Sequence, residues 1–168
     1  MATTKTGTSS VSTPGTIEVR PATAEDHGPL VDLVLQAWDA QAVAEGLDPK
    51  SRPSQRRVRA TLVDAGEDGR RSLLLAVEDG TIVGFGEMWV LPDLFVGGEV
   101  ALLRTLYVDP RLREQGVGTV LVERLLEVAH ARDARTVRVT SSIDNVEGLS
   151  FFQRRGLRST GLVLTRNL

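Results

Sequence analysis

The chain has 168 residues, of which 41% are apolar and 25% are charged, and its formal net charge is -2. This size and balance predict one globular domain and exclude a disordered chain. The small negative charge gives no overall basic field, so no nucleic-acid partner is expected. The absence of cysteine excludes disulfides, thiolate metal sites and a cysteine nucleophile. No metal is expected, because the two histidines, His27 and His130, fall in different predicted helices.

Residues 1–15 are rich in threonine and serine and are predicted to form a disordered tail. The ordered domain is predicted to span residues 16–168. No apolar run approaches the roughly 20 residues that cross a bilayer, and the N-terminus lacks the apolar core of a secretory signal. We therefore expect a cytoplasmic protein with no membrane partner.

The first predicted elements are a short strand at 17–20 and two helices. Thr23 and Asp26 have the spacing of a capping box and begin the first helix, in which apolar residues recur at helical spacing. Residues 38–48 extend or follow this helix. A second helix is expected at 54–64, with its arginines directed outward.

A β-hairpin is predicted next. Two apolar runs at 72–78 and 82–90 flank an Asp-Gly turn at 79–80, and Pro92 is expected to end the second strand. A third strand is expected at 99–108.

The last predicted elements are a helix at 118–132, a strand at 136–140, a helix at 145–155 and a closing strand at 162–165. Residues 99–140 have the form of a strand-helix-strand crossover, which is right-handed by default. The whole order predicts an α/β fold of the α+β type, in which helices pack on a mixed sheet.

The most informative segment joins the predicted strand at 99–108 to the predicted helix at 118–132. Gly116 and Gly118 lie where the loop becomes the helix, so backbone N–H groups can approach a ligand closely. These groups and the helix dipole form an anion site, to which Arg113 adds a positive charge. A P-loop needs a lysine after the second glycine, and a dinucleotide fingerprint needs glycine at Leu121, so both are excluded.

Two segments together resemble the GNAT superfamily of N-acetyltransferases. Arg113, Gly116 and Gly118, preceded by the strand ending at 106–110, match its motif A, Arg/Gln-x-x-Gly-x-Gly/Ala. Residues 145–157 are similar to its motif B, Asn-x-x-Ala-x-x-Phe-Tyr-x-x-x-Gly-Phe.

The resemblance implies a central, mixed and mostly antiparallel sheet flanked by helices, with a V-shaped splay between the fourth and fifth strands. It also implies acetyl-CoA as co-substrate and an amine as acceptor, which attacks the thioester directly. Asn145 has two readings, a contact to the pantetheine arm and a helix N-cap. The resemblance assigns coenzyme binding to Leu106, Tyr107, Val108, Arg113, Glu114, Gln115, Gly116, Val117, Gly118, Thr119, Asn145 and Phe152.

One residue departs from the family pattern. Phe152 stands where the family has a tyrosine that protonates the leaving thiolate, and a phenyl ring donates no proton. Tyr107, Ser150, Ser141 and a water molecule are the alternative acids. The departure also leaves open a second function, that of a catalytically silent acyl-CoA-binding module that regulates a partner.

Glu87 is the candidate general base, because it interrupts an apolar strand in which Val83, Phe85 and Trp89 are expected to share its face. Glu99 is a second candidate, and a solvated strand residue is the alternative reading for both.

Trp38 and Trp89 either line the acceptor pocket or pack in the core. The arginines at 52–59 are predicted to form a solvated helix face, with an anionic substrate as the alternative. A homodimer is the expected oligomeric state, although no residue in the sequence indicates it. The acceptor and the length of the acyl group stay open.

Overall fold

A computed structural model describes residues 16–67, 69–161, 163, 164 and 166, so the predicted tail at 1–15 lies outside the described residues. Five strands in these ranges form one sheet in the order β1-β2-β3-β4-β5. The first four strands pair antiparallel, and β4 pairs with β5 in parallel. The strands are β1 Ile17–Pro21, β2 Arg71–Glu78, β3 Thr81–Asp93, β4 Gly98–Val108 and β5 Ala134–Val139.

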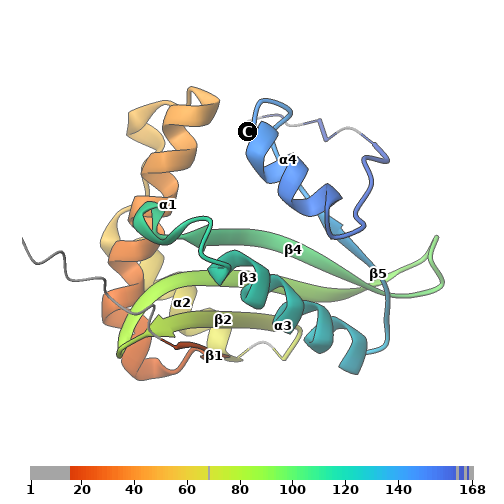
Figure 1. Cartoon of the computed structure of the whole chain (residues 1–168), viewed down its shortest axis with the longest axis horizontal. Coiled ribbons are helices and arrows are strands. Elements are labelled where there is room, and N and C mark those ends of the chain that lie inside the picture. Colours follow the sequence, from red (N-terminus) through yellow and green to blue (C-terminus); the bar gives the residue numbers. More distant parts are fainter. Residues whose placement is uncertain (1–15, 68, 162, 165, 167–168) are drawn as a thin grey trace, which may run out of the picture.

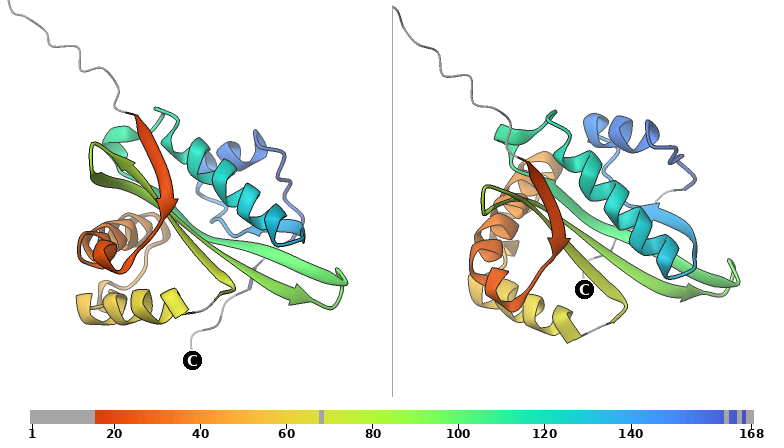
Figure 2. Two further views of the ribbon diagram at one scale, coloured as in Figure 1. Left: turned by 90° about the horizontal axis from the view of Figure 1, so that it is seen from below. Right: turned by 60° about the horizontal axis from the view of Figure 1, so that its bottom comes forward.

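Within the described part of the chain, four α-helices pack around this sheet. Helices α1 and α2 lie on one face and α3 lies on the other, as the views in Figures 1 and 2 show. The capping box of Thr23 and Asp26 is present and precedes α1 through a short 3-10 turn. The α-helices are α1 His27–Glu45, α2 Gln55–Glu67, α3 Val117–Ala131 and α4 Val146–Gln153.

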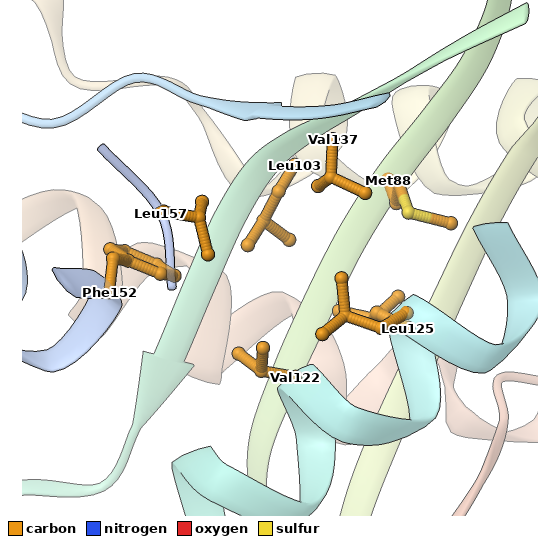
Figure 3. Close-up of a pocket in the computed structure, with 8 residues that line it drawn as sticks. Met88, Leu103, Val122, Leu125, Val137, Phe152 and Leu157 are labelled. Atoms are coloured by element: carbon orange, nitrogen blue, oxygen red, sulfur yellow. The ribbon is translucent and has the colours of Figure 1, made fainter. Parts of the chain in front are cut away.

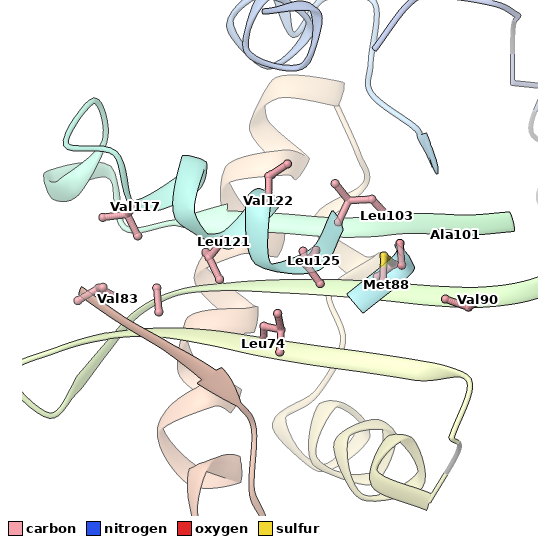
Figure 4. Close-up of a cluster of buried hydrophobic side chains, with 12 residues drawn as sticks. Leu74, Val83, Met88, Val90, Ala101, Leu103, Val117, Leu121, Val122 and Leu125 are labelled. Carbon is pink, nitrogen blue, oxygen red and sulfur yellow. The ribbon is translucent and has the colours of Figure 1, made fainter. Parts of the chain in front are cut away.

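Each face of the sheet has its own hydrophobic core. On the α3 face, Leu121 and Leu125 point from the helix onto the strands and are almost fully buried (Figure 4). The helix lies close to β3 because Gly86 has no side chain; an added Cβ would come 2.6 Å from a methyl group of Leu125. On the opposite face, Leu30 of α1 packs in a cluster that includes Phe85.

Strand β3 is longer than predicted, because Pro92 does not end it. Pro92 pairs with Glu99 of β4, and the strand continues to Asp93. Pairing with β2 ends at Trp89, so Pro92 lies where β3 has a neighbour on one side only, and a missing N–H is tolerated there.

The predicted closing strand at 162–165 is not part of the sheet as described. Residues 162 and 165 lie outside the described residues, and Val163 and Leu164 between them are not in a strand.

A β-bulge in β3 changes which side chains share a face. Ile82 pairs with Val77 and Gly84 pairs with Ala76, so Val83 is left between them. Val83 therefore packs on the α3 face, whereas Phe85 packs on the opposite face. The prediction that these two residues share a face is wrong, because the bulge interrupts the alternation of side chains.

The parallel pair at the end of the sheet opens into a splay. Pairing between β4 and β5 stops at Leu103 and Val139, whereas β4 continues to Val108 with β3 as its neighbour. This geometry confirms the mixed, mostly antiparallel sheet with a V-shaped splay between the fourth and fifth strands. Among the described residues, no helix is long and apolar enough to cross a membrane.

Candidate active site

A buried carboxylate fixes the turn at which β4 leaves the sheet. The N–H of Asp109 donates to the carbonyl of Val83 at 2.9 Å. Its side chain, which is 11% exposed, accepts from the backbone N–H of Arg111 at 2.9 Å and from the guanidinium of Arg111 at 2.6 Å. These hydrogen bonds from Arg111 lower the pKa of Asp109. These hydrogen bonds hold the turn together at the point where the loop to α3 begins.

That loop ends in a helix N-terminus with free donors. Gly116 is the N-cap of α3, with φ 87° and ψ -7°. The first hydrogen bond of the helix runs from the N–H of Val120 to the carbonyl of Gly116 at 3.1 Å. The N–H groups of Val117, Gly118 and Thr119 come before it and have no acceptor within the helix. These donors, with the helix dipole, form a site for an anion.

Side chains around this N-terminus leave it open. An added Cβ at Gly116 would meet no atom within 4 Å. Arg113, Glu114 and Gln115 of the loop are exposed, and Nε of Arg113 donates to the carbonyl of Val108 at 3.5 Å. The predicted loop residues are therefore brought together at one accessible turn.

The N-terminus of α3 contacts α4, although the two are far apart in the sequence. Arg155, which follows α4, lies 3.6 Å from the ring centroid of Phe151 and donates to the carbonyl of Phe151 at 2.8 Å. Its guanidinium also donates to the hydroxyl of Thr119 in the first turn of α3. An added Cβ at Gly118 would lie 3.5 Å from the ring of Phe151. The two sequence motifs thus lie side by side and contact each other through Arg155 and Phe151.

Asn145 is the N-cap of α4. Its side-chain oxygen accepts from the N–H of Gly148 at 3.0 Å, and its amide nitrogen donates to Ser141 at 3.4 Å. The N-cap reading is confirmed, and the contact of Asn145 to a pantetheine arm stays a prediction.

Phe152 lines a very small apolar cavity on the α3 face (Figure 3). The cavity has a volume of about 10 Å³. In Figure 3 the ring of Phe152 faces Leu157 and Leu103 across the space between α4 and β4. All of the lining residues are apolar, and they are Met88, Leu103, Val122, Leu125, Leu126, Val137, Phe152 and Leu157.

A larger cavity lies on the other face of the sheet, between α1, α2 and the strands. Its volume is about 310 Å³. Trp38 lines it, whereas Trp89 is not among its lining residues. The lining residues are Val34, Ala37, Trp38, Gln41, Pro53, Arg57, Val58, Thr61, Leu62, Arg71, Leu73, Phe85, Glu87 and Thr105.

Glu87 lies on the sheet side of this cavity and is fixed by three neighbours. Its Oε1 accepts a hydrogen bond from the indole N–H of Trp89 at 2.9 Å. The same oxygen forms an ion pair with Arg71 and lies 2.8 Å from its Nε, but this contact does not have hydrogen-bond geometry. Its Oε2 accepts only a long hydrogen bond of 3.3 Å, from the hydroxyl of Thr105. The Oε2 atom is therefore the oxygen with spare acceptor capacity beside Thr105.

Tyr107 lies in the core beneath α1 and α2. The residue is 8% exposed, and its ring packs against Phe85, with 6.0 Å between the ring centroids. Burial raises the pKa of its hydroxyl. Tyr107 is not among the residues that line either cavity.

Comparison with known proteins identifies the fold that holds these sites. The profile of the Acetyltransferase (GNAT) family matches residues 34–157. The chain belongs to this family. It is similar to an uncharacterised N-acetyltransferase of Methanocaldococcus jannaschii, with 32% identity over 65 residues, which are 39% of this chain and 29% of the relative. The chain thus spans less than a third of that relative's length.

Solved structures share the GNAT fold at low sequence identity. One is an aminoglycoside N-acetyltransferase in complex with CoA, with 18% identity and a TM-score of 0.78, covering 94% of this chain and 98% of that chain. Another is a transcriptional regulator from Bacillus halodurans C-125, with 21% identity and a TM-score of 0.77, covering 91% of this chain and 100% of that chain.

Two residues around Glu87 were missed in the sequence. Arg71 and Thr105 contact Glu87, but Arg71 is the first residue of β2 and Thr105 lies inside β4, so nothing in either local pattern marks them. The strand register brings them together, because Thr105 pairs directly with Glu87. Among the residues that the structure describes, no group of three acidic or histidine side chains could hold a metal ion.

Proposed function

We propose that this GNAT protein transfers an acetyl group from acetyl-CoA to a primary amine by direct attack. The observation that carries the proposal is the open N-terminus of α3, with three N–H groups ahead of its first helical hydrogen bond, beside the splay between β4 and β5. A diphosphate matches the positive end of a helix dipole. The CoA complex of a protein with the same fold supports the choice of this ligand.

The donor is proposed to lie along the splay, with its pyrophosphate on residues 113–119. Among the described residues, β5 does not pair with β4 from Leu106 to Val108, so backbone groups on that edge can pair with the pantetheine amides. Tyr107 then contributes through its backbone, because its side chain lies in the core on the opposite face. Asn145 and Phe152 would contact the arm from the α4 side.

A β-bulge lies where the thioester is expected. Glu87 pairs with Thr105 and Met88 pairs with Leu103, so Arg104 of β4 has no direct partner on β3. Bulges occur often beside active sites, where they redirect backbone groups. We propose that a strand N–H freed at this bulge polarises the thioester carbonyl.

The acceptor is proposed to enter from the cavity on the other face, where Thr105 and Glu87 lie. An alkylammonium with a pKa near 10.4 must first lose a proton, which Oε2 of Glu87 accepts directly or through water. The amine lone pair then forms a C–N bond to the carbonyl carbon, and the C–S bond breaks. The nitrogen loses its second proton and the thiolate gains one, so the reaction releases one proton overall.

Protonation of the leaving thiolate does not depend on Phe152. A thiol pKa near 8.5 makes the thiolate a good leaving group, so water can supply the proton. Tyr107, Ser141 and Ser150 stay candidate acids. The ring of Phe152 is also the single observation that supports a silent acyl-CoA-binding module instead of an enzyme.

Thiol release with a panel of primary amines tests the proposal, and calorimetry with CoA tests binding separately. Turnover is expected, and Glu87→Gln is expected to lower kcat/KM about 10²–10⁴-fold at neutral pH. The loss should shrink as the pH rises, because the free amine no longer needs a base. Tight CoA binding without turnover of any amine would favour the silent module. Longer acyl-CoA donors in the same assay define the acyl group.

A further inference from the structure

The cavity proposed for the acceptor is small and largely apolar. Eight of its lining residues are apolar, including Trp38 of α1 and Phe85 of β3. Its volume of about 310 Å³ lies at the lower end of the range of roughly 300–1,000 Å³ for small-molecule sites. The cavity therefore fits a single apolar group of modest size.

The charges that line the cavity are unequal. Arg57 and Arg71 provide two positive charges and Glu87 one negative charge, which leaves one positive charge in excess. The side chain of Arg71 is 7% exposed, is paired with Glu87, and donates to the carbonyl of Thr61 at 3.0 Å. The charge of Glu87 is thus already balanced, and the excess charge belongs to Arg57.

Arg57 is positioned to receive an anion. It lies on α2, it is exposed, and no acidic side chain among the described residues pairs with its guanidinium. Asp39 follows a lining residue, but its carboxylate is held by Arg52 at 2.6 and 2.8 Å. The hydrogen bonds from Arg52 lower the pKa of Asp39. Asp39 is therefore already compensated and does not offset Arg57.

We infer that the acceptor is a small amine that carries one apolar group and one carboxylate, as a hydrophobic amino acid does. The inference rests on the proposed function. The amine lies at Glu87 and Thr105, the apolar group packs against Trp38 and Phe85, and the carboxylate binds Arg57. A guanidinium binds a carboxylate through charge-assisted hydrogen bonds, whereas it repels a second cation. A polyamine or an aminoglycoside therefore does not match this cavity.

Matched acceptors test the inference through acetyl-CoA-dependent thiol release. Phenylalanine, phenylalaninamide and spermidine compare a carboxylate, its neutral amide and a polycation. We expect kcat/KM for phenylalanine to exceed kcat/KM for the amide by roughly tenfold, because the amide cannot make the charge-assisted hydrogen bond between a carboxylate and Arg57. The amine of phenylalaninamide is less basic than that of phenylalanine, so more of it is unprotonated at neutral pH. This difference alone would favour the amide, which is the opposite of the expected order. Equal or better use of spermidine would overturn the inference.

Two arginines of the same helix supply the variant and its control. Arg57→Gln is expected to lower kcat/KM for phenylalanine roughly tenfold and to leave that for the amide within twofold. Arg56 is exposed on α2 and does not line the cavity, so Arg56→Gln is expected to change neither value. Equal losses for phenylalanine and its amide in Arg57→Gln would mean that Arg57 does not bind the carboxylate.

Failure of the proposed function can be told apart from failure of this inference. If CoA binds and no amine is turned over, the transfer reaction is refuted, and calorimetry with phenylalanine and its amide decides about the cavity. A preference for phenylalanine that Arg57→Gln abolishes supports the inference. Equal binding of the two compounds to the parent protein overturns it.

Discussion

Substitution of Gly116 separates backbone strain from charge at the α3 N-terminus. Its φ of 87° lies in the left-handed region, and an added Cβ meets no atom within 4 Å. Gly116→Ala and Gly116→Glu therefore suffer the same backbone strain, which lowers the free energy of unfolding by about 1–2 kcal/mol. Only glutamate adds a charge, and repulsion between unit charges about 4 Å apart is about 1 kcal/mol in water and about 4 kcal/mol at an effective dielectric of 20. The dissociation constant for CoA should rise roughly 5- to 1,000-fold.

Urea unfolding measures the strain, and calorimetry with CoA measures the charge effect. Gly97, at the distant turn between β3 and β4, has φ 64° and the same open space, so Gly97→Glu is a matched control. It is expected to lose a similar free energy of unfolding and to bind CoA like the parent. If Gly116→Glu binds CoA as tightly as Gly116→Ala, the helix N-terminus is not the anion site and the proposed donor site is wrong.

Three other substitutions test the fold and the acid. Asp26→Asn should lower the free energy of unfolding by about 1.5–3 kcal/mol at pH 7, because it weakens the hydrogen bonds from Arg20 to Asp26 at 2.7 Å. Arg20 lowers the pKa of folded Asp26, so this stability is present above about pH 4 and is lost as the pH falls further; unfolding of parent and variant along a pH series should therefore converge in acid. Tyr107→Phe should keep kcat within about threefold, since the hydroxyl is buried away from both cavities, and a loss near 100-fold in the thiol-release assay would identify it as the acid. Phe152→Tyr should cost about 1–3 kcal/mol in urea unfolding if its hydroxyl enters the apolar cavity unpaired, and no loss would show that the hydroxyl finds a partner.

Local patterns were enough to predict most of the elements. The capping box at Thr23, the Asp-Gly hairpin turn and the N-cap at Asn145 all depend on residues within a few positions of one another. The structure has each of them where it was predicted. The loop from Arg113 to Gly118 belongs to the same class, because its glycines and the following helix are contiguous.

Features that depend on pairing between distant segments were not predictable. The bulge at Val83 and the continuation of β3 through Pro92 follow from the register with β2 and β4, which the sequence of β3 alone does not contain. Both errors have the same origin, since a bulge or an edge position changes what a strand residue contacts without changing the local pattern. The partner of Glu87, Arg71, is a third example, because it lies on a neighbouring strand.

Strand β4 explains how one site can combine a fixed donor with a variable acceptor. Its side chains alternate, so Leu106 and Val108 pack on the α3 face, whereas Thr105 and Tyr107 face α1 and α2. The proposed coenzyme site uses the backbone edge of the strand and the helix N-terminus, which tolerate changes of the side chains on the other face. The proposed acceptor site uses those other side chains, together with α1 and α2. Substitutions in the acceptor cavity, such as Arg57→Gln, should therefore change the choice of amine while CoA binding is kept.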